Sequence, residues 1–377
     1  MYEAEVSGLL KTLGVEFIVS LPCDRTKGLC SILEDKFRYI TVPREEDGVG
    51  ICSGLSLAGR KSVLQMQSSG IGNSLNALMT LPYLYGLSLP IIASWRGYYQ
   101  EKIPAQIPFN EKIPQLLALY DIPCTIISEP DDLAKISSAF SDAWDNRRPH
   151  VILISPRVWE GEEPQVSCIP LLRERTVELS YSRLISRPVM QRADAIRILT
   201  NLFTDELVVS NIGVPSKELY AAGDRALNFY MYGSYTQASS IGLGLDLGST
   251  RRTTVIDGDG SLLGTAVLPV AGEFGSSRLT IIGLDNGVFG STGNQCTPAH
   301  AQVDLELLAR AAGIKDTCKV HSAQELGEAY TRPQNLGPRF IHVIIRPGNT
   351  AAPNIPLTPT TIRDRFAASV SDSRNRY

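Results

Sequence analysis

The sequence predicts an α/β protein made of two doubly wound, parallel-sheet domains with no middle domain between them. The chain has 377 residues, which suits two domains of ordinary size. Short apolar runs alternate with segments of helical length, which is typical of parallel sheets covered by helices on both faces. The alternation stops once, near the middle of the chain, and then restarts. Two such blocks indicate two α/β halves that share one functional site.

The first domain is expected at residues 1–157. Its N-terminus has early acidic residues and no long apolar core, which predicts an amphipathic helix and excludes a typical signal peptide. The segments 45–58 and 73–85 have helical length and lie between apolar runs. Strands are expected at 15–21, 38–42, 62–67, 90–95, 125–128 and 150–155.

A linker is expected at residues 158–187, where charge, proline and short apolar stretches are mixed. The second domain follows at 188–377, with strands expected at 206–213, 253–260, 279–286 and 339–347. The tail from 348 to 377 is polar and contains proline, so we expect it to wrap a neighbouring subunit or to remain loose.

Composition excludes several classes of protein. The formal net charge is −3, so no global basic field attracts nucleic acid, and no apolar run has the length of a bilayer span. The seven cysteines form no CxxC or Cys/His pair with zinc spacing. Reduced thiols in a cytoplasmic protein are the simplest interpretation.

A glycine-rich turn at the end of a predicted strand carries the strongest chemical signal. Gly258, Asp259, Gly260 and Ser261 end the run at 253–260, and Asn286 ends the next one. The carboxyl ends of parallel strands face the ligand crevice, where Asp and Asn oxygens suit Mg²⁺. The glycines let backbone N–H groups approach phosphate, and the following helix N-terminus favours an anion. Such a turn before a helix is also common without any ligand, so the second strand end is essential to this interpretation.

The same run, together with the segment at 285–295, resembles the cofactor motif of thiamine-diphosphate-dependent enzymes, and most of all that of sulfopyruvate decarboxylases. The resemblance implies that Asp259 and Asn286 bind Mg²⁺, with the backbone carbonyl of Val288 as a third ligand. It covers nearly the whole chain, which looks like a fusion of two subunits that often occur separately. The stretch GSTGNQ at 290–295 is typical of the sulfopyruvate branch. The cofactor-binding residues implied are Gly258, Asp259, Gly260, Ser261, Asn286, Gly233, Ser234, Tyr235, Asn73, Gly290 and Ser291.

One of these positions departs from the family pattern. Relatives tend to have a hydrophobe, often Met, where Tyr235 stands, and that residue supports the bent cofactor. A tyrosine ring is bulky and apolar on its face, so Tyr235 can serve the same purpose.

An acidic cluster after the second predicted strand provides the candidate catalytic residue. By resemblance, a glutamate at this strand end contacts the aminopyrimidine ring of the cofactor. The small residues expected three, seven and nine positions later fit Glu45 better than Glu46. The alternative is that these acids only cap a helix N-terminus.

Candidate substrate-binding groups lie after the third and fourth predicted strands. Arginine forks well onto a sulfonate or carboxylate, although each cation here can also be an ordinary surface charge. The residues implied by the resemblance are Arg96, Lys102, Gln106 and Gln67.

Together these residues predict a decarboxylase that needs thiamine diphosphate and Mg²⁺ and converts 3-sulfopyruvate to sulfoacetaldehyde and CO₂, as in coenzyme M biosynthesis. We expect a homo-oligomer with the cofactor between subunits, and neither nucleic acid nor membrane as partner. The alternatives are a phosphonopyruvate decarboxylase, another 2-keto acid decarboxylase or an inactive cofactor-binding regulator. Because Gly242, Gly244 and Gly248 only approach the dinucleotide-binding pattern, an NAD-binding module is a weaker alternative.

Overall fold

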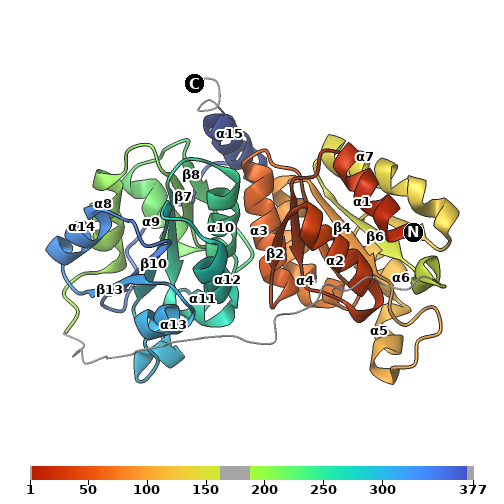
Figure 1. Cartoon of the computed structure of the whole chain (residues 1–377). Coiled ribbons are helices and arrows are strands. Elements are labelled where there is room, and N and C mark those ends of the chain that lie inside the picture. Colours follow the sequence, from red (N-terminus) through yellow and green to blue (C-terminus); the bar gives the residue numbers. More distant parts are fainter. Residues whose placement is uncertain (1, 162–186, 372–377) are drawn as a thin grey trace.

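Two α/β halves make up the structure (Figure 1). The computed structural model describes residues 2–161 and 187–371. Each half holds a six-stranded sheet in which every neighbouring pair of strands is parallel. Helices lie on both faces of each sheet. The predicted fold class, two doubly wound parallel sheets, is therefore confirmed.

The sheet of the first half has the strand order β2-β1-β3-β4-β6-β5. Its strands are short apolar runs, and those at its centre are buried on both faces. The strands are β1 (Phe17–Ser20), β2 (Arg38–Thr41), β3 (Ser62–Gln67), β4 (Leu89–Ser94), β5 (Cys124–Ile127) and β6 (Pro149–Ile154). The helices are α1 (Tyr2–Thr12), α2 (Lys27–Lys36), α3 (Glu45–Leu57), α4 (Gly70–Leu78), α5 (Ile107–Asn110), α6 (Ile113–Leu119) and α7 (Lys135–Asp145).

The sheet of the second half has the order β13-β14-β10-β9-β7-β8. Its strands are β7 (Leu207–Ser210), β8 (Asn228–Tyr230), β9 (Thr253–Gly258), β10 (Leu279–Asp285), β13 (Asp316–Val320) and β14 (Arg339–Ile344). A small hairpin, β11 (Val288–Phe289) with β12 (Gln295–Cys296), follows β10. The helices are α8 (Arg192–Leu202), α9 (Val214–Ala222), α10 (Ala238–Gly248), α11 (Asp259–Gly264), α12 (Val267–Phe274), α13 (Leu305–Ala311), α14 (Ala323–Thr331) and α15 (Pro359–Ser371).

Two strands of the second sheet, β8 and β13, are absent from the sequence prediction. Both lie at the edges of the sheet, where one side of a strand makes no ladder. β8 has three residues, and β13 carries charged residues at Asp316 and Lys319. Neither gives the continuous apolar run that marked the central strands.

Part of the C-terminal tail is ordered, contrary to one of the two expectations for it. Residues 359–371 form α15, which packs on β8 and α3 of the same chain and is not loose. Ile362, Phe366 and Val370 recur at helical spacing and are buried, and the Phe366 ring meets that of Phe229 on β8. The predicted linker falls mostly on 162–186, which lie outside the described residues.

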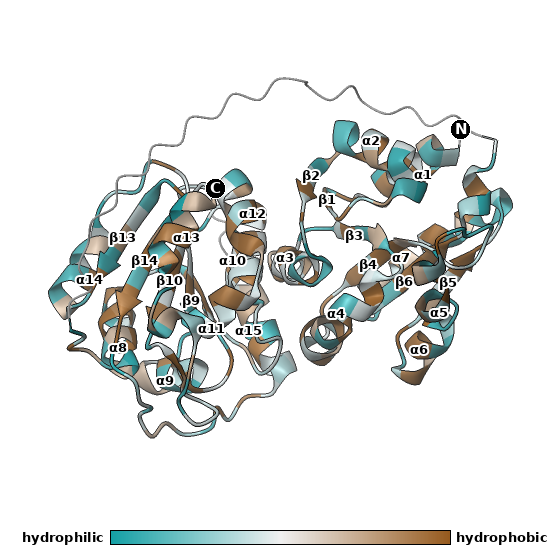
Figure 2. Ribbon diagram, turned by 90° about the horizontal axis from the view of Figure 1, so that it is seen from below, coloured by the Kyte–Doolittle hydropathy of each residue, from teal (hydrophilic) through white to brown (hydrophobic). Residues whose placement is uncertain are grey.

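Helices α3 and α10 join the two halves and lie side by side (Figure 2). Gly54 of α3 lies against the backbone carbonyl of Ile241, and Gly244 of α10 lies against the carbonyl of Ile51. A Cβ atom on Gly54 would lie 2.9 Å from the Cα atom of Gly244. Glycine at both positions therefore lets the two backbones touch, and one continuous cluster of buried apolar side chains runs through both halves.

Among the described residues, no helix combines the length and the apolar composition needed to cross a bilayer.

Candidate active site

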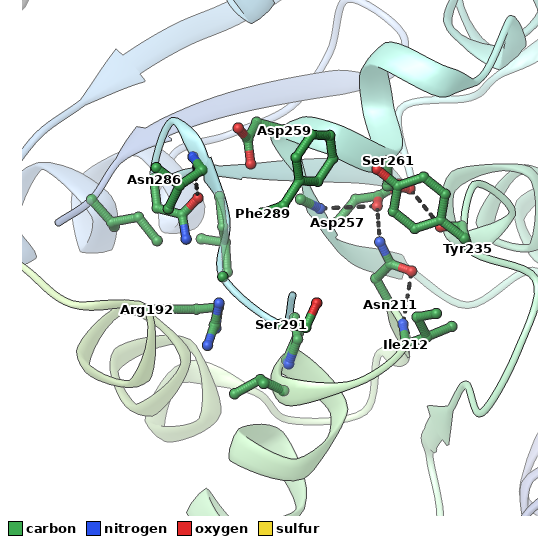
Figure 3. A pocket seen from close by; sticks show the side chains of 18 residues that line it. Arg192, Asn211, Ile212, Tyr235, Asp257, Asp259, Ser261, Asn286, Phe289 and Ser291 are labelled. Carbon is green, nitrogen blue, oxygen red and sulfur yellow. Dashed lines mark hydrogen bonds between the residues drawn. The ribbon is translucent and has the colours of Figure 1, made fainter. Parts of the chain in front are cut away.

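A small cavity opens at the carboxyl edge of the second sheet (Figure 3). Its volume is about 110 Å³, below the ~300–1,000 Å³ of pockets that enclose a whole cofactor. The ends of β7, β9 and β10 all reach it, as the crevice rule for parallel sheets requires. Its lining includes the residues predicted from the glycine-rich turn and from the segment after β10, namely Gly258, Asp259, Gly260, Ser261, Asn286, Val288, Gly290, Ser291 and Tyr235.

The carboxylate of Asp259 is the central acidic group of this cavity. It is buried, and its Oδ2 accepts a hydrogen bond from the Thr297 hydroxyl at 2.5 Å. Burial raises the pKa of Asp259 to about 6, and the charge of Asp285 acts in the same direction. The described residues provide no cation to pair with it. A buried carboxylate of this kind is the donor that a divalent cation stabilises.

The loop after β10 brings an amide and a backbone carbonyl to the same cavity. Gly287 adopts φ +68°, and its N–H donates to Oδ1 of Asp285 at 2.9 Å. The Oδ1 atom of Asn286 accepts from the backbone N–H of Val288 at 3.0 Å, which fixes the amide in a tight turn. Asn286 and Val288 therefore face the cavity that Asp259 also lines.

These donors fit a hard divalent cation. One carboxylate, one amide oxygen and one backbone carbonyl form an all-oxygen set, which suits Mg²⁺ better than a soft metal. In the described ranges, no group of three or more His, Cys, Asp or Glu residues forms a metal site. The proposed ligands include only one such residue, Asp259, and so do not form a group of that kind.

Behind the loop, a buried charge network holds Asp285. The Nε2 atom of His342 lies 2.8 Å from Oδ2 of Asp285, and its Nδ1 atom lies 3.6 Å from Oδ1 of Asp304. Asp304 in turn pairs with Lys319. Burial opposes the protonation of His342, but its two carboxylate neighbours outweigh burial and raise its pKa. His342 is absent from the site residues predicted from the sequence.

Asn211 and Asp257 also line the cavity and were missed in the sequence. Asp257 is fully buried and accepts from Asn211 Nδ2 at 2.8 Å, Ser239 Oγ at 2.7 Å and the Gly258 N–H at 2.9 Å. Burial raises the pKa of Asp257. These bonds fix the turn into α11, and each residue stands at or just after a strand end, which was the available signal.

The turn before α10 lies at the side of the cavity. Ser234 adopts φ +59°, and its hydroxyl lies 2.8 Å from that of Thr80 in the first half. Gly233 also lies against Thr80. The hydroxyl of Tyr235 lies 2.6 Å from the position that a Cβ atom on Gly260 would take, so its ring extends towards the glycine-rich turn. The departure from the family pattern thus places an aromatic ring at the cavity.

Glu45 lies at the first turn of α3 in the other half. Its carboxylate is buried, and Oε2 accepts from Asn73 Nδ2 at 3.1 Å. Two positions later, Asp47 accepts from the Thr265 hydroxyl at 2.6 Å and the Ala266 N–H at 2.9 Å. Since Thr265 and Ala266 directly follow α11, the start of α3 is docked beside the segment that begins with Asp259.

The predicted substrate-binding residues lie along the carboxyl edge of the first sheet, outside the lining of the cavity. Arg96 donates two hydrogen bonds to Glu101, at 2.7 and 3.1 Å, and both side chains are buried. Gln106 accepts from the Ser69 hydroxyl at 2.5 Å, and Lys102 is exposed. Gln67 is the half-buried last residue of β3. The charge of Arg96 is therefore offset by Glu101 of its own chain, and its contact with a substrate stays a prediction.

Comparisons with known protein families agree with this architecture. Residues 3–116 match the N-terminal TPP-binding domain of thiamine pyrophosphate enzymes, and residues 216–343 match the C-terminal TPP-binding domain. Thiamine pyrophosphate is another name for thiamine diphosphate.

Curated relatives cover the whole chain or one half of it. A sulfopyruvate decarboxylase from Methanosarcina acetivorans is 45% identical over 97% of this chain and 96% of its own length. A phosphonopyruvate decarboxylase from Streptomyces viridochromogenes is 32% identical over 98% and 94%. Separate sulfopyruvate decarboxylase subunits also match. The beta subunit from Methanothermobacter thermautotrophicus is 40% identical over 48% of this chain and 96% of the subunit. The alpha subunit from Methanococcus maripaludis is 39% identical over 40% of this chain and 92% of the subunit.

Solved structures share the fold at low sequence identity. A protein from Mycobacterium smegmatis superposes with a TM-score of 0.70 at 14% identity, over 92% of this chain and 99% of that chain. Benzoylformate decarboxylase from Polynucleobacter necessarius superposes with a TM-score of 0.60 at 13% identity, over 93% of this chain and 99% of that chain.

Proposed function

This chain belongs to the sulfopyruvate decarboxylase family of thiamine-diphosphate-dependent enzymes, and from that membership we propose that it converts 3-sulfopyruvate to sulfoacetaldehyde and CO₂. The observation that carries the proposal is the meeting of Asp259, Asn286 and the Val288 segment around one cavity at the carboxyl edge of a parallel sheet.

The cavity is the proposed site for Mg²⁺ and the diphosphate end of the cofactor. Asp259, Asn286 and the carbonyl of Val288 would bind the ion, and Gly260 and Ser261 would contact phosphate oxygens at the start of α11. Because about 110 Å³ holds only part of the cofactor, the remainder must extend out of the cavity. Tyr235 and the turn at 233–234 lie beside that path.

Bound thiamine diphosphate supplies the carbon centre that accepts the electrons released when a 2-keto acid loses CO₂. The role of Glu45 is to hydrogen-bond the pyrimidine ring of the cofactor through its buried carboxyl group. Asn73 fixes the orientation of that carboxyl group, and Asp47 fixes the position of the helix turn that carries it. Enclosure of the reacting centre between a first-half domain and a second-half domain would exclude bulk water and favour conversion of a charged carboxylate into neutral CO₂.

We assign sulfopyruvate and not phosphonopyruvate as the substrate because the full-length sulfopyruvate decarboxylase is 45% identical to this chain, whereas the phosphonopyruvate decarboxylase is 32% identical. We place the reaction in coenzyme M biosynthesis and the enzyme in the cytoplasm. A homo-oligomer with active sites at subunit interfaces is also part of the proposal. The separate alpha and beta subunits of relatives support assembly from such halves.

Steady-state assays test the proposed function directly. Purified protein supplied with thiamine diphosphate and Mg²⁺ should release CO₂ from 3-sulfopyruvate with kcat/KM at least tenfold above that for phosphonopyruvate. Removal of Mg²⁺ by a chelator should abolish both cofactor binding and turnover. A preference for phosphonopyruvate would replace the substrate assignment, and failure to bind the cofactor would remove the function altogether.

A further inference from the structure

The carboxyl edge of the first sheet carries two arginines and a single carboxylate that lies close to both. Arg96 follows β4, and Arg25 lies in the short helical turn Asp24–Thr26 that follows β1. Both approach Glu101, whose pKa is held at about 2 chiefly by the hydrogen bonds from Arg96. Two positive charges share one negative charge, so the cluster keeps a net charge of about +1 at neutral pH.

Glu101 is already saturated by donors other than Arg25. Its Oε1 accepts from Arg96 Nη2, Lys102 N and Ile103 N, each at 3.1 Å. Its Oε2 accepts from Arg96 Nε at 2.7 Å and from Gly97 N at 3.4 Å. The closest nitrogen of Arg25 stays 3.6 Å from Oε1, which is an ion-pair distance and too long for a hydrogen bond.

Arg25 therefore differs from Arg96 and Arg44, the other arginines discussed at this edge. Its side chain is 31% exposed, against 6% for Arg96, and no described residue accepts a hydrogen bond from its guanidinium group. Arg44 is paired with Glu46 and with a carbonyl of the second half. All the guanidinium donors of Arg25 are available for a ligand. In Arg96, by contrast, Nε and Nη2 donate to Glu101 and Nη1 contacts the Cys23 sulfur at 3.9 Å.

The turn that carries Arg25 is rigid and central. Strand order puts β1 between β2 and β3, so this turn lies between the segment leading to Glu45 and the start of α4, whose Asn73 contacts Glu45. The neighbouring Thr26 is buried and accepts from Gln65 Nε2 at 3.0 Å. A cation on a fixed turn at the same sheet edge as the proposed catalytic carboxylate is preorganised for an anionic substrate.

We propose that Arg25 binds the terminal sulfonate of the substrate and that the Arg96–Glu101 pair braces it, which makes Arg25 a specificity-determining residue. The proposal rests on the proposed function, because it names the group that recognises the distal anion of a small 2-keto acid. Guanidinium offers paired N–H donors that match two oxygens of a sulfonate, and lysine at the same place would supply charge without that fork.

The test compares substrates with and without the sulfonate. Arg25→Ala should lower kcat/KM for 3-sulfopyruvate by about 10- to 100-fold, mainly through KM, since a charge-assisted pair contributes about 1.5–3 kcal/mol. The kcat/KM for pyruvate, which lacks the sulfonate, should change less than about twofold. Arg25→Lys should recover part of the loss. The matched control is Lys27→Ala, which removes an exposed neighbouring cation and should leave both substrates unaffected.

A binding measurement makes the test independent of turnover. The inhibition constant of 3-sulfopropanoate should rise in parallel with KM in Arg25→Ala, while thiamine diphosphate binding, followed by tryptophan fluorescence, should stay unchanged. Equal losses on sulfopyruvate and pyruvate, or an unchanged inhibition constant, would overturn the assignment of Arg25. If instead the wild-type enzyme does not act on sulfopyruvate, it is the proposed function that fails.

Discussion

The carboxyl edges of the two sheets have the same parallel architecture but differ in the charged and polar side chains that they carry. In the second half, Asp257 and Asp259 line a cavity, and the described part of the chain pairs no cation with Asp259. In the first half, polar groups pair with one another, as Arg96 does with Glu101 and Asn73 with Glu45. In the proposed function, one edge would be completed by a cation from outside, while the other is preorganised by its own side chains. In this proposal the same doubly wound fold would bind the ion and phosphate groups in one half and would provide the catalytic and recognition surface in the other.

The strongest way to break this comparison is to disable the first edge while the second stays intact. Glu45→Gln should lower kcat by about 10²- to 10⁴-fold, because an amide cannot exchange a proton with the cofactor as a carboxyl group can. Cofactor binding should survive, since the proposed diphosphate and metal ligands all lie in the second half. Turnover and isothermal titration calorimetry measure the two effects separately.

The control for that variant is Glu46→Gln, which changes the adjacent acid on the same helix turn. Glu46 pairs with Arg44 and lies outside the proposed catalytic contact, so its variant should keep at least about one third of the activity. Full activity in Glu45→Gln would show that the proton-exchanging group lies elsewhere.

A smaller effect is expected when His342, which lies behind the proposed metal ligands of the second sheet, is replaced. His342→Asn should weaken Mg²⁺ binding by about 10- to 100-fold, because residues behind metal ligands contribute on that scale by orienting them. The readout is the Mg²⁺ concentration that gives half-maximal cofactor binding. Saturating Mg²⁺ should restore most of the cofactor binding of the variant. His150→Asn is the matched control, since His150 is also buried and paired with an aspartate but lies in the first half. Equal metal affinities in the two variants would contradict a positioning role for His342.

The smallest effect concerns acid stability of the first edge. The folded-state pKa of Glu101 is about 2, below the ordinary value of 4.5. Its contribution to the free energy of unfolding is thus complete above pH 4.5 and is lost as the pH falls towards 2. Denaturant titrations should show a shallower loss of stability across that interval for Glu101→Gln than for wild type, by about 1 kcal/mol. Glu111→Gln, which removes an exposed carboxylate from the same half, should follow the wild-type curve.

The fold and the second edge were predictable because their signals are local. Continuous apolar strands gave the parallel sheets, and the turn at Gly258–Ser261 was visible because it stands at the end of one such strand. The pairing of Arg96 with Glu101 was not predictable, since it depends on a loop that turns back by five residues, and no signal in the sequence marked Arg25. The same limit hid His342, whose partners Asp285 and Asp304 are far from it in the chain. The helical tail was missed because its three apolar contacts are sparse in a polar segment.

The contact between Gly54 and Gly244 bears on whether the two halves are encoded as one polypeptide or as two. Two helices that meet backbone to backbone form a close interface between the halves, and relatives carry sequences similar to parts of this chain on separate alpha and beta polypeptides. Joining them adds no chemistry. It raises the local concentration of each half near its partner and guarantees that both are made in equal number, so gene fusion here is a device for stoichiometry.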